Sequence, residues 1–202
     1  MVTASIDVVR LPRRQANDAA LVTEIADLVN SVYAVAENGL WVEQATRTTR
    51  KEIAGYIKAQ EITVARIGTR IVGCVRVQRL DLHTGEFGML AAAPEERGRG
   101  IGRRLVSSAE RQCFHSGCST MQLELLVPRT WSHPSKEFLA SWYARIGYTI
   151  ARTGTIDESY SNLAPLLATE CDFVIYHKDL GATCDITPAP SPPVVSTADR
   201  PG

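Results

Sequence analysis

The fold is decided by the stretch Glu86-Phe-Gly-Met-Leu-Ala-Ala-Ala-Pro-Glu-Glu-Arg97-Gly98-Arg99-Gly100-Ile101-Gly102-Arg103-Arg104-Leu105. An apolar strand here runs into a glycine-rich turn, and a helix follows the turn at once. Because glycine lacks a Cβ atom, the backbone of such a turn can approach an anion closely and point successive N–H groups at it. The positive end of the helix dipole adds to this attraction, and four arginines surround the turn. The sequence therefore predicts a binding site for a pyrophosphate.

Two common phosphate-binding motifs are absent from this turn. A GxxxxGK loop followed by Ser or Thr does not occur, and the dinucleotide pattern GxGxxG would need glycine in place of Arg103. The pattern that matches is Arg or Gln, two residues, Gly, one residue, then Gly or Ala, as Arg97-x-x-Gly100-x-Gly102. A second pattern lies within the segment 138–148, as Trp142-Tyr143-Ala-Arg-Ile-Gly147-Tyr148. With both motifs in order, the chain from about Ile62 to Lys178 resembles the GNAT superfamily of N-acetyltransferases.

The resemblance implies a cofactor and the residues that hold it. In that family the turn binds the coenzyme A pyrophosphate through backbone amides, and the preceding strand separates from its neighbour so that its backbone can pair with pantetheine. We therefore expect acetyl-CoA as acyl donor, with no metal. The implied cofactor-binding residues are Leu90, Ala91, Ala92, Arg97, Gly98, Arg99, Gly100, Ile101, Gly102 and Arg103. An ordinary glycine-rich turn with solvated arginines is the alternative, and the second motif disfavours it.

Aminolysis of a thioester needs a group that takes the proton of the amine. An alkyl ammonium with a pKa near ~10 keeps that proton at pH 7, so it must leave directly or through water. Glu86 lies eleven positions before Arg97, where histone-modifying members place their glutamate base, and it is our first candidate. Water alone, His83 and His133 are the alternatives. Tyr143 matches the family tyrosine near the coenzyme A sulfur and is the candidate general acid. By the same resemblance, the backbone N–H of Leu90 would stabilise the oxyanion.

The acceptor pocket of the family is built from the loop between the first two helices and the loop between the last two strands. Here these are residues 35–48 and 153–161. Carboxylates and aromatic rings in these loops could hold a cationic amine. The candidate substrate-binding residues are Glu37, Trp41, Asp157 and Tyr160. Surface carboxylates usually contact only water, so the sequence names no amine beyond a small-molecule or peptidyl one.

Three functions compete on this evidence. The leading one is an N-acetyltransferase that uses direct attack on the thioester, because no cysteine lies beside a histidine in a nucleophile motif. The alternative is a non-catalytic, regulatory acyl-CoA-binding module with the same fold. A nucleic-acid-binding domain is the weakest, because 22 Lys and Arg balance 22 Asp and Glu and leave no net field.

The composition of the chain limits where in the cell the protein is expected and how many domains it has. No apolar run approaches the ~20 residues that span a bilayer, and the N-terminus lacks the apolar block of a secretory signal. We expect a cytoplasmic protein without membrane or nucleic-acid partners, and a homodimer is the assembly to test. Five cysteines form no CxxC pair and indicate neither a disulfide framework nor a zinc site. We expect one domain over residues 1–183 and a proline-rich, disordered tail over 184–202.

Periodicity predicts the secondary structure around the motifs. After a first apolar stretch over residues 6–11, strands are expected over residues 62–66, 71–79, 86–91, 121–127, 148–152 and 173–178. Helices are expected behind Asn17 or Asp18, behind the capping box Thr49-x-x-Glu52, from Ile101 and around Phe138. The predicted fold is α/β, a single mixed, mostly antiparallel twisted sheet of six or seven strands with helices on both faces.

Overall fold

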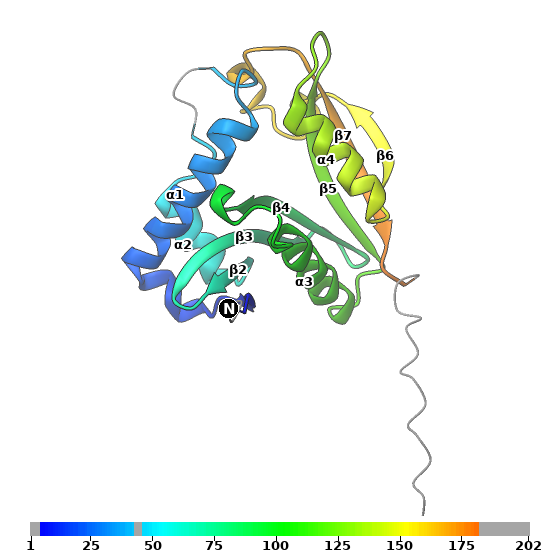
Figure 1. The fold of residues 1–202 in the computed structure, drawn as a ribbon. Coiled ribbons are helices and arrows are strands. Elements are labelled where there is room, and N and C mark those ends of the chain that lie inside the picture. The colour runs from blue at the N-terminus through cyan, green and yellow to red at the C-terminus, as the bar shows by residue number, and fades with distance from the viewer. Residues whose placement is uncertain (1–4, 43–45, 182–202) are drawn as a thin grey trace, which may run out of the picture.

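A computed structural model of the chain describes residues 5–42 and 46–181, and within them seven strands form one sheet in the order β1-β2-β3-β4-β5-β7-β6 (Figure 1). The strands are β1 (Asp7–Arg10), β2 (Ile62–Ile67), β3 (Arg70–Arg79), β4 (Thr84–Ala92), β5 (Thr120–Pro128), β6 (Thr149–Gly154) and β7 (Cys171–Asp179). Only β4 and β5 pair in parallel, and every other neighbouring pair is antiparallel. The predicted mixed, mostly antiparallel sheet is confirmed. The predicted tail, its boundary and Cys184 lie outside the described residues.

Helices cover both faces of this sheet. The α-helices are α1 (Ala19–Ala36), α2 (Arg50–Lys58), α3 (Ile101–His115) and α4 (Pro134–Arg145). Short 3-10 turns are η1 (Arg13–Asn17), η2 (Pro94–Glu96), η3 (Ile156–Glu158) and η4 (Ala164–Leu166). Because side chains alternate along a strand, Val64 packs with α1 and α2 while Ala65 packs with α3. Tyr143 brings α4 into the same core as α3.

The two predicted helix caps on the N-terminal side are confirmed. Asp18 Oδ1 accepts a hydrogen bond from Leu21 N at 3.1 Å, which satisfies one of the free donors of α1. Thr49 and Glu52 form the predicted capping box at the start of α2. Both helices therefore begin where the sequence places their caps.

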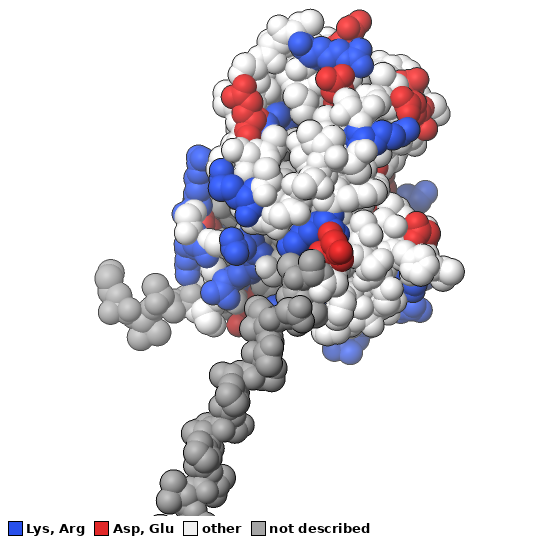
Figure 2. Space-filling model, turned by 90° about the vertical axis from the view of Figure 1, so that its right-hand side faces the viewer, with Lys and Arg blue, Asp and Glu red and all other residues white. Residues whose placement is uncertain are grey.

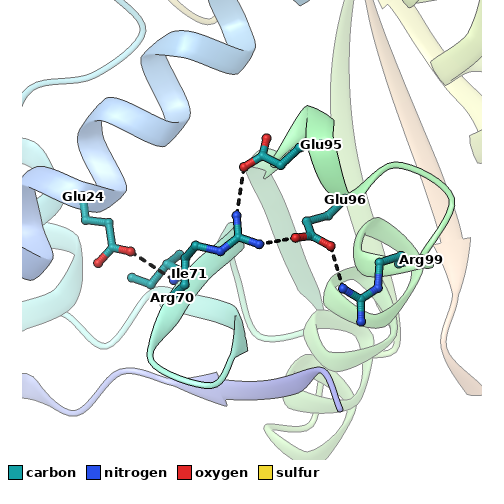
Figure 3. Close-up of polar contacts among 6 residues, drawn as sticks. All are labelled: Glu24, Arg70, Ile71, Glu95, Glu96 and Arg99. Atoms are coloured by element: carbon teal, nitrogen blue, oxygen red, sulfur yellow. Dashed lines mark hydrogen bonds and ion pairs between the residues drawn. The ribbon is translucent and has the colours of Figure 1, made fainter. Parts of the chain in front are cut away.

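α1 is the one described helix whose length and composition would let it cross a membrane, which our reading of apolar runs overlooked. Its Leu21, Ile25 and Val29 are buried in the core. Its Glu24 accepts a hydrogen bond from the backbone N–H of Ile71 at 3.0 Å (Figure 3). These contacts are those of a core helix, which passes the same test.

The central strands β4 and β5 are paired for only three residues. Their register runs from Thr84 opposite Thr120 to Glu86 opposite Gln122 and then stops. On the other side of β4 the register with β3 shifts between Cys74 and Arg76, and Met89 has a φ of 49°, a conformation rare outside glycine. This bulge accompanies the separation of the strands in Figure 1. We call the region between residues 87–92 of β4 and 123–128 of β5 the fork, and its vertex is Glu86.

Candidate functional site

The glycine-rich turn stands at the start of α3, where the sequence places it. Gly98 and Gly100 have φ values of +84° and +75°, which L side chains rarely adopt. A Cβ atom at either position would meet no atom within 4 Å, so open space lies in front of the turn. Among the described residues, N–H groups without a protein acceptor belong to Gly98, Gly100, Ile101, Gly102 and Arg103. The turn thus presents a row of unpaired donors, as an anion site requires.

A cluster of ion pairs holds this turn against the β2–β3 hairpin (Figure 3). Glu96 accepts from Arg99 Nη1 at 2.6 Å and also pairs with Arg70. Arg70 reaches Glu95 with its other nitrogen at 2.9 Å. Hydrogen bonds from Arg99 and Arg70 lower the pKa of Glu96. The guanidinium of Arg99, predicted to face the phosphates, is therefore engaged with Glu96, and the structure gives it a role in positioning the turn.

Positive charge continues beside the turn. A pocket of about 490 Å³ lies between α3 and α4, with Arg103, Arg145 and Lys178 among its lining residues. Lys178 is paired with Glu110 at 2.9 Å. Figure 2 shows Lys and Arg side chains gathered along one edge of this side of the molecule, with both signs mixed above.

The backbone of β4 faces the fork at alternate residues. Ala93 N donates to Val72 O at 2.9 Å and Ala91 pairs with Cys74, so these two residues point toward β3. The alternation leaves the backbone groups of Leu90 and Ala92 toward the fork, where β5 no longer pairs with them. Ala91, which the sequence grouped with them, has its side chain in the core and its backbone turned away from the fork.

Tyr143 lies at the fork from the side of α4. Its ring is 6.1 Å from that of Phe87, the residue next to Glu86, and its side chain is almost fully buried. Burial raises the pKa of this phenol, and Tyr33 on the opposite side adds to the effect. Buried tyrosine hydroxyls usually find a partner, yet no described residue accepts or donates a hydrogen bond here. The hydroxyl is protonated and free to donate to a ligand.

Glu86 is buried at the vertex of the fork and is hydrogen-bonded through both oxygens. Gln78 Nε2 donates to Oε1 at 2.8 Å, and Gln122 Nε2 donates to Oε2 at 3.0 Å. Gln122 in turn contacts His177 Nε2 at 3.0 Å. These two amide donors fix the position of the carboxyl group. Glu86 is therefore held on the sheet face opposite α4.

Glu124 is a second carboxylate on that face, two residues along β5 from Gln122. Burial and the neighbouring Glu86 carboxylate raise its pKa to about 7, against partial compensation by Tyr160 and Arg47. Tyr160 donates its hydroxyl to Glu124 Oε2 at 2.8 Å. Sequence reasoning missed Glu124 as a site residue, although it lies in the strand predicted over residues 121–127, where it alternates with the buried Leu123 and Leu125.

The predicted acceptor residues do not all meet at this place. Tyr160 joins the carboxylates, whereas Asp157 lines a separate pocket of about 430 Å³ with Arg129. Glu37 is engaged on both oxygens, by Lys136 Nζ at 2.6 Å and by Trp41 Nε1 at 2.6 Å. The Lys136 contact joins the end of α1 to α4, whereas the Trp41 contact is local to the chain after α1.

The alternative bases occupy other surroundings. His83 is exposed before β4, at the end where β4 and β5 are still paired. His133 is buried beside Trp131 at the start of α4, and its Nδ1 has no hydrogen-bond partner among the described residues. The described cysteines are all buried thiols, and no group of three His, Cys, Asp or Glu side chains in the described part of the chain could hold a metal.

Several solved structures of acetyltransferases have a similar fold. Among solved structures, an aminoglycoside 6'-N-acetyltransferase complexed with coenzyme A has a TM-score of 0.64 at 15% identity, over 86% of this chain and 97% of that one. The NatC complex bound to Gag peptide and coenzyme A gives 0.61 at 17% identity, over 87% and 98%. N-acetylglutamate synthase from Neisseria gonorrhoeae, complexed with coenzyme A and N-acetyl-glutamate, gives 0.59 at 18% over 88% of this chain, which spans only 35% of the synthase.

These identities show a shared fold. The search of curated proteins produced no match. The family model described as acetyltransferase (GNAT) matches residues 25–141, more than half of the sequence. The chain belongs to the GNAT acetyltransferase family.

Proposed function

We propose that this protein transfers the acetyl group of acetyl-CoA to a primary amine, which attacks the thioester directly. The observation that carries the proposal is that one fork joins three features. Unpaired amides stand at the glycine turn, a buried tyrosine without a partner lies against Phe87, and a pair of carboxylates lies at the vertex. Family membership and coenzyme A complexes among the structural neighbours support the same donor.

The residues present fit coenzyme A. The unpaired amides of Gly98, Gly100, Ile101, Gly102 and Arg103 would hold its pyrophosphate. Arg103 and Arg145 add positive charge in the pocket between α3 and α4, which Glu110 and Asp179 also line. The backbone of Leu90 and Ala92 would pair with pantetheine along the unpaired edge of β4. The bound donor supplies an activated acetyl carbonyl as a thioester.

Glu86 and Glu124 have different roles in removing the proton of the attacking amine. Glu86 is fixed by two amide donors, and its charge raises the pKa of Glu124 to about 7 after burial has already raised it. A base works best when its pKa lies near the operating pH. We therefore assign the proton of the attacking amine to Glu124, with Glu86 as the fixed neighbour, which shifts the role that the sequence gave to Glu86. Tyr143, kept protonated by burial, donates to the departing sulfur.

The experiment is acetyl-CoA turnover across a panel of amines, followed by thiol release, for the native chain, Glu124→Gln and Glu86→Gln over pH 5 to about 9. The native rate should rise with pH through about 7, because Glu124 acts as its carboxylate. Glu124→Gln should lose this rise and roughly 10²–10⁴-fold of the rate. Tight acetyl-CoA binding without amine-dependent thiol release would favour the non-catalytic module instead.

An independent readout checks the Glu124 environment. Folding raises the pKa of Glu124 from 4.5 to about 7, so its ionisation opposes folding above pH 7 and not below pH 4.5, where both states are protonated. Glu124→Gln should therefore raise the unfolding midpoint near pH 8 and leave it unchanged near pH 4. Equal midpoints at both pH values would remove the basis of the assignment.

A further inference from the structure

Arg47 lies near the end of the α1–α2 loop, next to a residue that hydrogen bonds hold in place. The side chain of Asn30 on α1 binds the backbone of Thr48 twice, from Nδ2 to the carbonyl at 3.0 Å and from the Thr48 N–H to Oδ1 at 3.0 Å. Thr48 itself is buried, and α2 begins from the capping box at Thr49. The backbone that follows Arg47 therefore has a defined position.

The guanidinium of Arg47 is stacked on an aromatic ring. Its Cζ lies over the ring of Tyr33 on α1, 5.1 Å from the ring centroid. Tyr33 is within electrostatic reach of Tyr143, on the opposite side of the fork. The Arg47–Tyr33 pair therefore lies on the α1 side of the fork, across from α4 (Figure 1).

Arg47 has a charge that the described residues leave without a salt bridge. Eight ion pairs join described side chains, and none includes Arg47. Arg47 is exposed at the surface, and the neighbouring Tyr33 and Glu37 raise its pKa against a desolvation that acts in the opposite direction. A guanidinium has five N–H donors in a planar fork that fits a carboxylate with two parallel hydrogen bonds, and one contact to Tyr33 leaves most of them available.

Opposite charges therefore face one another across the acceptor side of the fork. The Arg47 charge reaches Glu124 and Tyr160, where it lowers pKa values that burial raises. An acceptor between them would have its amine at the carboxylate pair and another group at the guanidinium. A polycationic acceptor would place a positive group against Arg47, which is unfavourable.

We propose that the acceptor carries a carboxylate beside its amine, as an amino acid does, and that Arg47 binds this carboxylate while Glu86 and Glu124 face the amine. This rests on the proposed function and names the substrate class of the same site. Arg47 is then the residue that selects the acceptor. In the competing explanation, Arg47 only balances the charge of the two glutamates, and it would serve every amine equally.

The test uses matched pairs of acceptors, L-α-amino acids and the α-carboxamides of the same amino acids, with saturating acetyl-CoA. The native chain should have the higher kcat/KM for the acid of at least one pair, by roughly 10–100-fold, the worth of a charge-assisted hydrogen bond. Arg47→Ala should remove most of this ratio through KM, with little effect on the carboxamides and on coenzyme A affinity. Arg47→Lys should restore part of it, because it returns the charge without the planar fork.

Arg50→Ala is the matched control, since Arg50 is an exposed arginine at the first position of α2, three residues away. The ratio of its kcat/KM values for acid and carboxamide should equal that of the native chain. A loss of rate in Arg47→Ala that is the same for acids and carboxamides would overturn the inference, as would a native preference for the carboxamide. Should no amine be acetylated at all, the proposed function fails, and NMR binding of the acids to the coenzyme A complex decides: binding lost in Arg47→Ala supports the inference, and no binding refutes it.

Discussion

Gly100→Glu tests the central requirement of the site, open backbone donors at the turn. Gly100 has a φ of +75° and a Cβ there meets nothing within 4 Å, so the unliganded fold should bear only the left-handed backbone, about 1–2 kcal/mol. The new carboxylate would stand where a diphosphate binds. Two unit charges roughly 5 Å apart interact by about 3 kcal/mol at an effective dielectric constant near 20. Coenzyme A affinity should therefore fall by at least ~100-fold.

The assay is calorimetric titration with coenzyme A, next to thermal unfolding without ligand. Gly117→Glu is the matched control, because Gly117 also has a positive φ of +88° and open space, and it follows the other end of α3. A helix of 15 residues is about 22 Å long, which exceeds the screening length at physiological salt. Both variants should unfold at similar temperatures, and only Gly100→Glu should lose affinity. Native affinity in folded Gly100→Glu would refute the placement of the pyrophosphate.

Three further changes address neighbouring parts of the site. Tyr143→Phe should lower kcat well beyond any change in coenzyme A affinity, and native kcat would remove its donor role. Glu96→Gln should weaken coenzyme A binding a few-fold near pH 7, because Arg70 and Arg99 lose their charged partner. These arginines lower the pKa of Glu96, so the difference in affinity between variant and native chain should vanish as the pH falls below that pKa. A difference that does not depend on pH would contradict a role for these ion pairs in holding the turn. Lys136→Met should cost about 3–5 kcal/mol of unfolding free energy by leaving buried Glu37 unpaired, whereas pairing it with Glu37→Leu should recover much of that loss.

Local patterns were enough to predict most elements of the fold. The capping residues Asp18 and Thr49, the β2–β3 hairpin and the turn into α3 each depend on contacts within a few residues, which a sequence displays directly. The separation of β4 from β5 came from family resemblance. The positive φ of Met89, which lies at this separation, could not be predicted, because a methionine does not indicate a left-handed backbone as a glycine does.

The candidate site was only half predictable, for a physical reason. The phosphate turn is one contiguous hexapeptide, whereas the polar group at the vertex is assembled from separate segments: Gln78 and Gln122 bind Glu86, and Tyr160 binds Glu124. Spacing along the chain does not reveal which of two carboxylates receives amide donors and which is left with a raised pKa. Burial and partner geometry decide this, and both arise only when β3, β4 and β5 lie side by side.

Arg99 and Glu37 were predicted as ligand groups because they are charged residues in the expected loops. In the structure each also has protein partners, Glu96 for Arg99 and Lys136 with Trp41 for Glu37. Arg47 is the reverse case, an unremarkable loop arginine that the fold stacks on Tyr33 without any described carboxylate to neutralise it. Charge that the protein has already neutralised positions the site, and charge that it leaves open is what a substrate can meet; the acceptor should therefore be sought among amines that bring their own anion.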